Sequence, residues 1–151
     1  MQETSVSYEK LLTSIPGITE EEFQELNKYL SYTVYPQDTI VVKEGDPGTF
    51  MGFLIKGRLA IRKETSFDGK YILIAILEEG SIFGENSVVE QHPRNATIRT
   101  LEECHALILT HDNAQKVISS HPELGVKLLS KILRVVGVRL RKSASRIADV
   151  L

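Results

Sequence analysis

The feature that most constrains the fold is a regular alternation of short β-rich runs and glycine-bearing turns between residues 32 and 110. The runs recur about every ten residues, a spacing typical of a sandwich or barrel. They are Tyr32–Tyr35, Thr39–Val42, Phe50–Ile55, Leu59–Lys63, Tyr71–Leu77, Ala96–Thr100 and His105–Leu109. We therefore expect a mainly β fold with flanking helices, whose centre, residues 32–110, is an antiparallel β-roll resembling a jelly-roll barrel.

The dipeptide Asp68-Gly69 is the strongest hairpin signal within this region. A type I′ turn needs positive φ at both central residues, and glycine adopts such a φ at little cost. The dipeptide therefore predicts a type I′ turn between the runs on either side of it.

Residues 1–31 read as a small helical cap that precedes the roll. Thr19 and Glu22 have the spacing of a capping box, which predicts that a helix begins directly after Thr19. A short helix over Tyr8–Leu12 is expected before it, and the Pro16-Gly17 pair separates the two.

Residues 111–151 have a helical pattern that His121-Pro122 divides into a short helix over Asp112–Ser120 and a long one after it. In the long helix, apolar residues repeat at alternating steps of four and three, which is the pattern of a heptad seam. The seam consists of Leu129, Leu133, Val136, Leu140, Ser143, Ile147 and Val150, and a second stripe of Leu128, Ile132 and Val135 would face the roll. Because one helix with two apolar faces needs two partners, we expect the seam to bind a second copy of the chain. The alternative is that the seam covers core of its own chain.

Length and composition indicate an ordinary globular protein. The 151 residues suit one domain over 1–151, and the 42% hydrophobic and 25% charged content is typical of such domains. No apolar run approaches the roughly 20 residues of a membrane span, and the N-terminus lacks a secretory pattern. The single Cys104 has no partner for an internal disulfide and is read as a small strand residue. We expect a cytoplasmic protein with no membrane association.

Catalysis and nucleic-acid binding find little support in the sequence. It contains no GKS or GKT phosphate loop, no paired metal ligands and no clustered histidines, so we expect neither an enzyme nor a cofactor or metal. The net charge of −2 points to no polyanionic partner. Basic residues do gather late in the long helix, but we interpret them as a solvated face outside the seam. They are Arg139, Arg141, Lys142 and Arg146.

The stretch FGENSVVEQHPRNATI, residues 83–98, carries the best candidate site. Gly84 permits a close turn, and the N–H groups of a helical turn that begins at Glu85 would attract an anion. The planar guanidinium of Arg94 suits a phosphate, and we expect it to have no partner within the protein. Glu85 would then face a hydrogen-bond donor such as a ribose hydroxyl. The alternative is a solvated ion pair between Glu85 and Arg94 on a loop.

Phe83-Gly84-Glu85 and Pro93-Arg94-Asn95-Ala96-Thr97 closely resemble the phosphate-binding cassette of cyclic nucleotide-binding domains, as in catabolite activator proteins and the regulatory subunits of cyclic AMP-dependent protein kinase. The resemblance extends over most of the chain and includes Glu44–Gly48, Leu54–Arg58 and Asp68–Lys70. It implies that Gly84, Arg94 and Asn95 bind the cyclic phosphate and that Glu85 binds the ribose. Ser87 would supply a further amide, and the neighbouring Asn86 and Ala96 complete the cassette part of the candidate site.

The same resemblance implies a role for the long helix, in which Leu140-Arg141-Lys142-Ser143 is similar to the segment where a hydroxyl residue meets the base. Ser143 could equally be a polar residue that sets the register of a coiled coil. The absence of threonine directly after Arg94 favours cyclic AMP over cyclic GMP. We therefore expect a nucleotide sensor whose long helix signals to a second copy or to an unidentified effector. The alternatives are a scaffold of the same fold without ligand, and the sensor part of a transcription regulator without its DNA-binding part.

Overall fold

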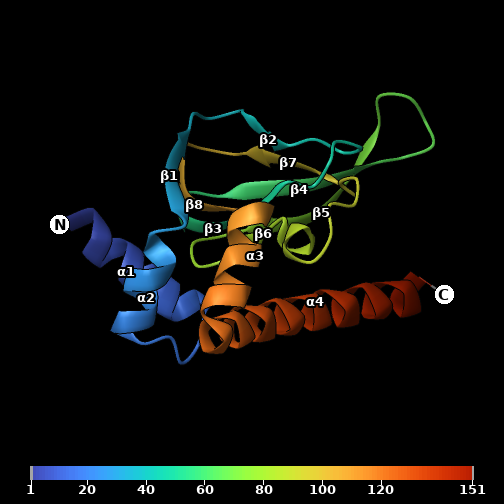
Figure 1. The fold of residues 1–151 in the computed structure, drawn as a ribbon. Coiled ribbons are helices and arrows are strands. Elements are labelled where there is room, and N and C mark those ends of the chain that lie inside the picture. Colours follow the sequence, from blue (N-terminus) through green and yellow to red (C-terminus); the bar gives the residue numbers. More distant parts are fainter. Residues whose placement is uncertain (1, 151) are drawn as a thin grey trace.

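The centre of the protein consists of two four-stranded sheets in the computed structural model, which describes residues 2–150. One sheet has the order β1-β8-β3-β6 and the other β2-β7-β4-β5, and all pairings are antiparallel. The strands are β1 Leu30–Tyr35, β2 Ile40–Val42, β3 Phe50–Lys56, β4 Leu59–Glu64, β5 Tyr71–Leu77, β6 Ile82–Phe83, β7 Thr97–Thr100 and β8 Cys104–Thr110. Figure 1 shows the roll above the long C-terminal helix. This arrangement confirms the predicted β-roll.

Each predicted run became a strand with ends within two residues of those expected, but β6 was missed. Two residues are too few to show an alternating pattern, so the sequence predicts no separate strand at Ile82–Phe83. The Phe83 ring packs directly over Gly52 of β3, where a Cβ atom would lie 2.1 Å from the ring. Glycine at position 52 therefore makes room for Phe83 in the core.

The hairpin between β4 and β5 is present, but its predicted turn type is wrong. Gly69 has φ of 75°, whereas Asp68 is not among the residues with positive φ. The amide of Lys70 donates to the carbonyl of Phe67 over 3.2 Å, so the turn consists of residues 67–70. Positive φ occurs only at its third residue, Gly69, as in a type II turn. The Thr65 hydroxyl also accepts from the Phe67 amide, which stabilises a loop of six residues, 65–70, in place of a two-residue connection.

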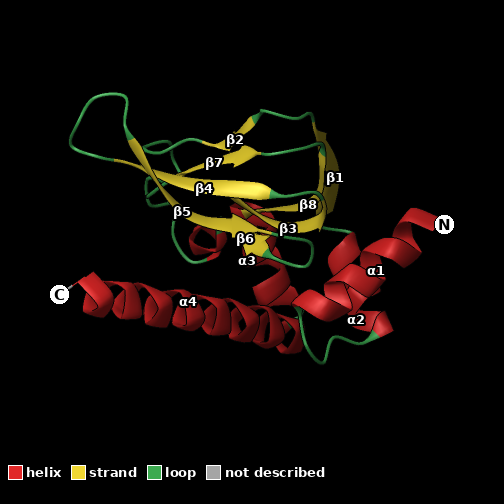
Figure 2. Cartoon of the chain, turned by 180° about the vertical axis from the view of Figure 1, so that it is seen from behind, coloured by secondary structure: helices red, strands yellow, loops and turns green. Residues whose placement is uncertain are grey.

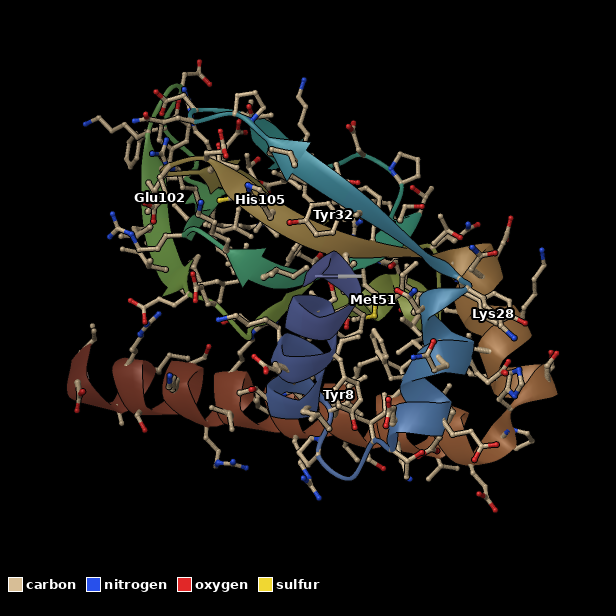
Figure 3. The ribbon with its side chains drawn as sticks, turned by 90° about the vertical axis from the view of Figure 1, so that its left-hand side faces the viewer. Tyr8, Lys28, Tyr32, Met51, Glu102 and His105 are labelled. Carbon is tan, nitrogen blue, oxygen red and sulfur yellow. The ribbon has the colours of Figure 1, made fainter. Side chains whose placement is uncertain are left out.

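The N-terminal helices close the side of the roll. The predicted helix over Tyr8–Leu12 is longer, since α1 spans Gln2–Ser14, and α2 spans Glu20–Asn27. The capping box at Thr19 is confirmed, with both reciprocal bonds to Glu22 at 3.1 Å. Tyr8 meets Phe23 edge to face at 5.0 Å, and Figure 3 shows it on the side where α1 approaches Met51 of β3.

The C-terminal helices are α3, His111–Ser120, and α4, Pro122–Val150. Leu128 and Ile132 are buried in the core cluster, and Val135 packs against it, as predicted for the stripe that faces the roll. The seam is different, because Leu133, Leu140 and Ile147 are 73%, 68% and 61% exposed. Figure 2 shows α4 extending alone beyond α3. Leu129 at the start of the seam packs against the core cluster, but from Leu133 onward the seam is exposed and does not cover core of its own chain.

None of the helices in the described part of the chain combines the length and hydropathy needed to cross a membrane. Cys104 is buried in β8, consistent with its interpretation as a strand residue.

Candidate functional site

A pocket of about 220 Å³ lies between the second sheet, the turn after β6 and one side chain of α4. Seven of the eight predicted site residues line it: Gly84, Glu85, Asn86, Ser87, Arg94, Asn95 and Ala96. The structure therefore brings the candidate cassette together around one cavity. Ser143 is the exception and does not line the pocket.

The turn at Gly84 creates the floor of this pocket. Gly84 has φ of 65°, and a Cβ atom there would lie 2.8 Å from Arg94 Nη1 and 2.9 Å from the carbonyl oxygen of Phe50. Only glycine satisfies both the backbone conformation and the close approach. It leads directly into η1, a short 3₁₀ helix over Glu85–Val88, in which the amide and hydroxyl of Ser87 both donate to the Gly84 carbonyl.

Arg94 does have partners within the protein, so the expectation that it lacks them is wrong. Its Nη2 donates to the Phe50 carbonyl at 2.5 Å and its Nη1 to the Gly84 carbonyl at 3.3 Å. The guanidinium also lies 4.9 Å from the centre of the Phe50 ring. Burial lowers the pKa of Arg94, and the nearby Glu85 carboxylate opposes that shift. Arg94 is thus held in place, with N–H groups left over from the five that a guanidinium carries.

Glu85 is only 7% exposed, and its carboxylate accepts a hydrogen bond from Arg139 of α4. Arg139 also donates to the Ile82 carbonyl at 2.8 Å. The alternative of a solvated Glu85–Arg94 pair is therefore wrong, as is the interpretation of Arg139 as part of a solvated face. The long helix passes under the roll (Figure 1). Its hydrogen bond places residue 139 beside residue 85, a proximity that spacing along the chain does not indicate.

Most of the remaining wall is apolar and was not among the predicted site residues. It consists of Val42, Ile61, Ile74, Phe83 and Ile98, with His92 and Pro93 at one side. The inward positions of Val42 and Ile98 follow from strand alternation, which would have identified them. Ile74 gave no such signal, because it lies at an irregularity in the β4–β5 register, where Ile61 pairs with Ala75 and Arg62 with Leu73.

The pocket therefore combines a guanidinium, a buried carboxylate, a 3₁₀ helix start and an apolar wall. The guanidinium and the helix start can bind an anion, the carboxylate can bind a hydroxyl group, and the apolar wall can bind a flat apolar surface. A comparison with known families identifies the family to which a domain with this pocket belongs. Residues 32–121 match the family model described as "Cyclic nucleotide-binding domain". The chain belongs to the cyclic nucleotide-binding domain family.

Relatives and solved structures agree with this assignment. The chain is 29% identical over 135 residues to a CRP-like cAMP-activated global transcriptional regulator of Mycobacterium tuberculosis, which covers 89% of this chain and 58% of that protein. A solved cyclic nucleotide-binding domain of Methylobacillus flagellatus has a TM-score of 0.88 at 25% identity, covering 97% of this chain and 86% of that one. The Thermus thermophilus catabolite activator protein has the same fold, with a TM-score of 0.78 at 22% identity over 91% and 62% of the two chains. The chain spans a little over half the length of the curated relatives it matches.

Ser143 of this cyclic nucleotide-binding domain lies on the exposed part of α4. It follows Arg139 by one helical turn, yet it is directed neither into the pocket lining nor into the core. Within one chain the structure therefore does not bring Ser143 to the cassette residues.

A larger hollow of about 730 Å³ lies elsewhere in the domain, between α2 and the junction of α3 with α4. Two charged contacts cross it, since Glu22 contacts Lys127 at 2.5 Å and Glu25 contacts His121 at 3.4 Å. It contains none of the cassette residues. Within residues 2–150, no group of three or more His, Cys, Asp and Glu side chains is placed to hold a metal ion.

Proposed function

We propose that residues 1–151 form a single sensor domain that binds cyclic AMP in the pocket beside η1 and transmits binding through α4, acting in the cytoplasm. One observation carries the proposal: the half-buried Arg94 guanidinium and the buried Glu85 carboxylate line the same pocket. A cyclic nucleotide has a phosphate for the first group and a ribose hydroxyl for the second.

The phosphate would meet Arg94, the turn at Gly84 and the start of η1. Asn86, Ser87, Asn95 and Ala96 complete this part of the site by lining the same cavity. Because Arg94 is already oriented by two backbone carbonyls, little side-chain entropy would be lost when it binds the phosphate. Its lowered pKa is consistent with a guanidinium that gains a counter-charge from the ligand.

The ribose would meet Glu85. An ionised carboxylate only accepts hydrogen bonds, so it recognises a donor such as the 2′-hydroxyl. Arg139 holds the carboxylate in place from α4, and the pocket therefore includes one group of the helix that would carry the signal.

The choice of cyclic AMP over cyclic GMP rests on two observations. Asn95 rather than threonine follows Arg94. In addition, several matched regulators are named as cAMP-activated, including those of Mycobacterium tuberculosis and Pasteurella multocida. The relatives are regulators by name, which favours a sensor over an enzyme.

The output would run through a homodimer that α4 forms with a second copy. Leu133 and Leu140 expose an apolar stripe that a second α4 would cover. Ser143 lies on the same stripe, so it would meet the base of the nucleotide bound by the other copy. The effector protein that receives the signal is left open, and we do not propose nucleic-acid binding for this chain alone.

The competing function is a scaffold of the same fold that binds no ligand. A further alternative is the sensor part of a longer transcription regulator, which fits the 58% coverage of the mycobacterial relative.

Calorimetric titration with cyclic AMP, cyclic GMP and linear AMP tests the proposal. We expect saturable binding of one cyclic AMP per chain, weaker binding of cyclic GMP and none of AMP. No heat of binding with either cyclic nucleotide at millimolar concentration would favour the scaffold.

A further inference from the structure

The last carbonyl groups of η1 point away from the pocket and need partners outside it. The C-terminal carbonyls of a helix have no N–H group within the helix that donates to them. In η1 these belong to Ser87 and Val88, which are 2% and 0% exposed, so water does not satisfy them. A buried carbonyl without a donor would destabilise the turn that forms the pocket floor.

Two side chains of α3 supply the donors. Nδ1 of His111 lies 2.5 Å from the Ser87 carbonyl oxygen, and Nε2 of Gln115 donates to the Val88 carbonyl at 2.6 Å. Because a carbonyl oxygen can only accept, Nδ1 must carry the proton in this contact. The two residues are one helical turn apart and lie on the same face of α3. Together they hold successive carbonyls of η1 at two points.

The N-terminus of α3 is itself fixed to the strand that orients Arg94. The backbone amide of His111 donates to the Thr49 carbonyl at 2.8 Å, and the next carbonyl along the chain, that of Phe50, accepts from Arg94. The Thr110 hydroxyl caps the helix by accepting from the Asn113 amide at 3.1 Å. The donors on α3 and the guanidinium of Arg94 therefore share one rigid support.

At its other end α3 packs closely on α4. A Cβ atom at Gly125 would lie 3.0 Å from the Cα atom of Ile118, so the two helices approach as near as glycine allows. The amide of Gly125 also donates to the His121 carbonyl at 2.9 Å. Direct contacts therefore join η1 to α3 and α3 to the start of α4.

We propose that His111 and Gln115 are positioning residues that clamp the C-terminal end of η1 and so orient Glu85 and the cassette amides toward the pocket. They touch the backbone of η1 rather than the ligand. The clamp deepens the proposed nucleotide-binding function and rests on it for its effect on affinity. Its effect on η1 itself does not depend on any ligand.

The test compares His111→Leu, Gln115→Met and their combination, which remove the donors while keeping side-chain bulk. His111→Asn retains an N–H near the position of Nδ1 and serves as the rescue variant. Lys116→Met is the matched control, because Lys116 is the exposed neighbour of Gln115 on α3. Each protein is measured by thermal melting, by hydrogen exchange of the amides of residues 85–90, and by titration with cyclic AMP.

In the ligand-free protein we expect faster exchange at residues 85–90 in the double variant, a wild-type rate in Lys116→Met, and partial recovery in His111→Asn. For cyclic AMP we expect about three- to tenfold weaker binding for each donor removed. Wild-type exchange at η1 in the double variant would overturn the clamp. So would a lower melting temperature with unchanged affinity and no rescue by asparagine, which would indicate a merely structural contact. If the wild-type protein binds no cyclic nucleotide, the proposed function fails while the exchange measurement still decides the clamp.

Discussion

The carboxylate of Glu85 is held by the guanidinium of Arg139, 54 residues later in the chain. The carboxylate side chain is 9% exposed and that of Arg139 34%, so the pair is largely shielded from water. It connects the middle of α4 with the pocket. The residue proposed to bind the ribose is therefore oriented by the helix proposed to carry the signal.

Replacing Arg139 should destabilise the ligand-free protein, because Arg139→Met leaves a buried carboxylate without its donor. We expect a loss of about 1–3 kcal/mol in the free energy of unfolding, below the value for a fully buried pair because part of Arg139 is exposed. Urea denaturation measures it, and Arg141→Met is the control, since Arg141 is exposed on the same helix. Glu85→Gln/Arg139→Met should cost less than the sum of the single changes. Strict additivity would show that the two residues do not interact.

Arg94→Lys should weaken both nucleotide binding and the fold. Lysine keeps the charge but cannot bond both the Phe50 and Gly84 carbonyls, so we expect stability to fall by about 1–2 kcal/mol. Cyclic AMP affinity should fall by about 10- to 100-fold. Calorimetry and thermal melting measure the two effects. Arg99→Lys is the control, because Arg99 makes only a 3.8 Å surface contact with Asp38. Unchanged affinity would remove Arg94 from the site.

Glu85 should distinguish cyclic AMP from its 2′-deoxy analogue. A site built to bond a hydroxyl rejects the analogue without it, because the buried acceptor is then left unpaired. We expect at least about tenfold weaker binding of the 2′-deoxy form to the wild-type protein. Glu85→Gln should bind cyclic AMP more weakly and discriminate less. Equal affinities for the two ligands in the wild type would mean that Glu85 serves only to hold Arg139.

The exposed seam on α4 should make the native protein a dimer. Each large aliphatic side chain gains about 1.5–3 kcal/mol when fully buried, and Leu133 and Leu140 are available for this. Analytical ultracentrifugation should show a dimer for the native protein and a monomer for Leu133→Asp/Leu140→Asp. If Ser143 also meets the ligand, cyclic AMP and dimerisation must strengthen each other by the same factor. A native protein that stays monomeric at high concentration with and without cyclic AMP would contradict this.

Glu22 should contribute stability that is lost in acid. Burial raises the pKa of its carboxyl, but hydrogen bonds from Lys127 and Thr19 outweigh this effect and hold the pKa below 4.5. A pKa lowered by folding stabilises the protein above the unfolded value and ceases to do so as pH falls through the folded value. Urea unfolding should show Glu22→Gln to be less stable than wild type at pH 7, with the difference shrinking as the pH falls below about 4.5. The exposed Glu21→Gln is the control, and a pH-independent difference would exclude the ionised carboxylate as the cause.

Local patterns accounted for every strand except β6, for the starts of α2, α3 and α4, and for the residue types of the cassette, whereas α1 begins six residues before the predicted helix. The strand runs follow from alternation and turn residues, and the start of α2 follows from Thr19 and Glu22, which bond each other across three residues. Gly84 and Arg94 lie ten residues apart, and their residue types suit a close turn and a phosphate-binding fork, but only the resemblance to the phosphate-binding cassette joined them into one site. These features depend on interactions between near neighbours in the chain, so they can be predicted without knowing how the helices pack on the sheets.

Contacts between segments far apart in the chain could not be predicted from the sequence. Arg139 reaches Glu85, Arg94 bonds Phe50, and His111 bonds Ser87 only because the helices pack on the roll at one particular position and angle. Many surfaces of a basic helix look alike in sequence, and the solvated interpretation of Arg139 was the ordinary one for an arginine outside the apolar stripes. Which arginine is buried, and against which carboxylate, is decided by the packing of the whole chain, since only that packing removes water from the pair and makes its alignment favourable.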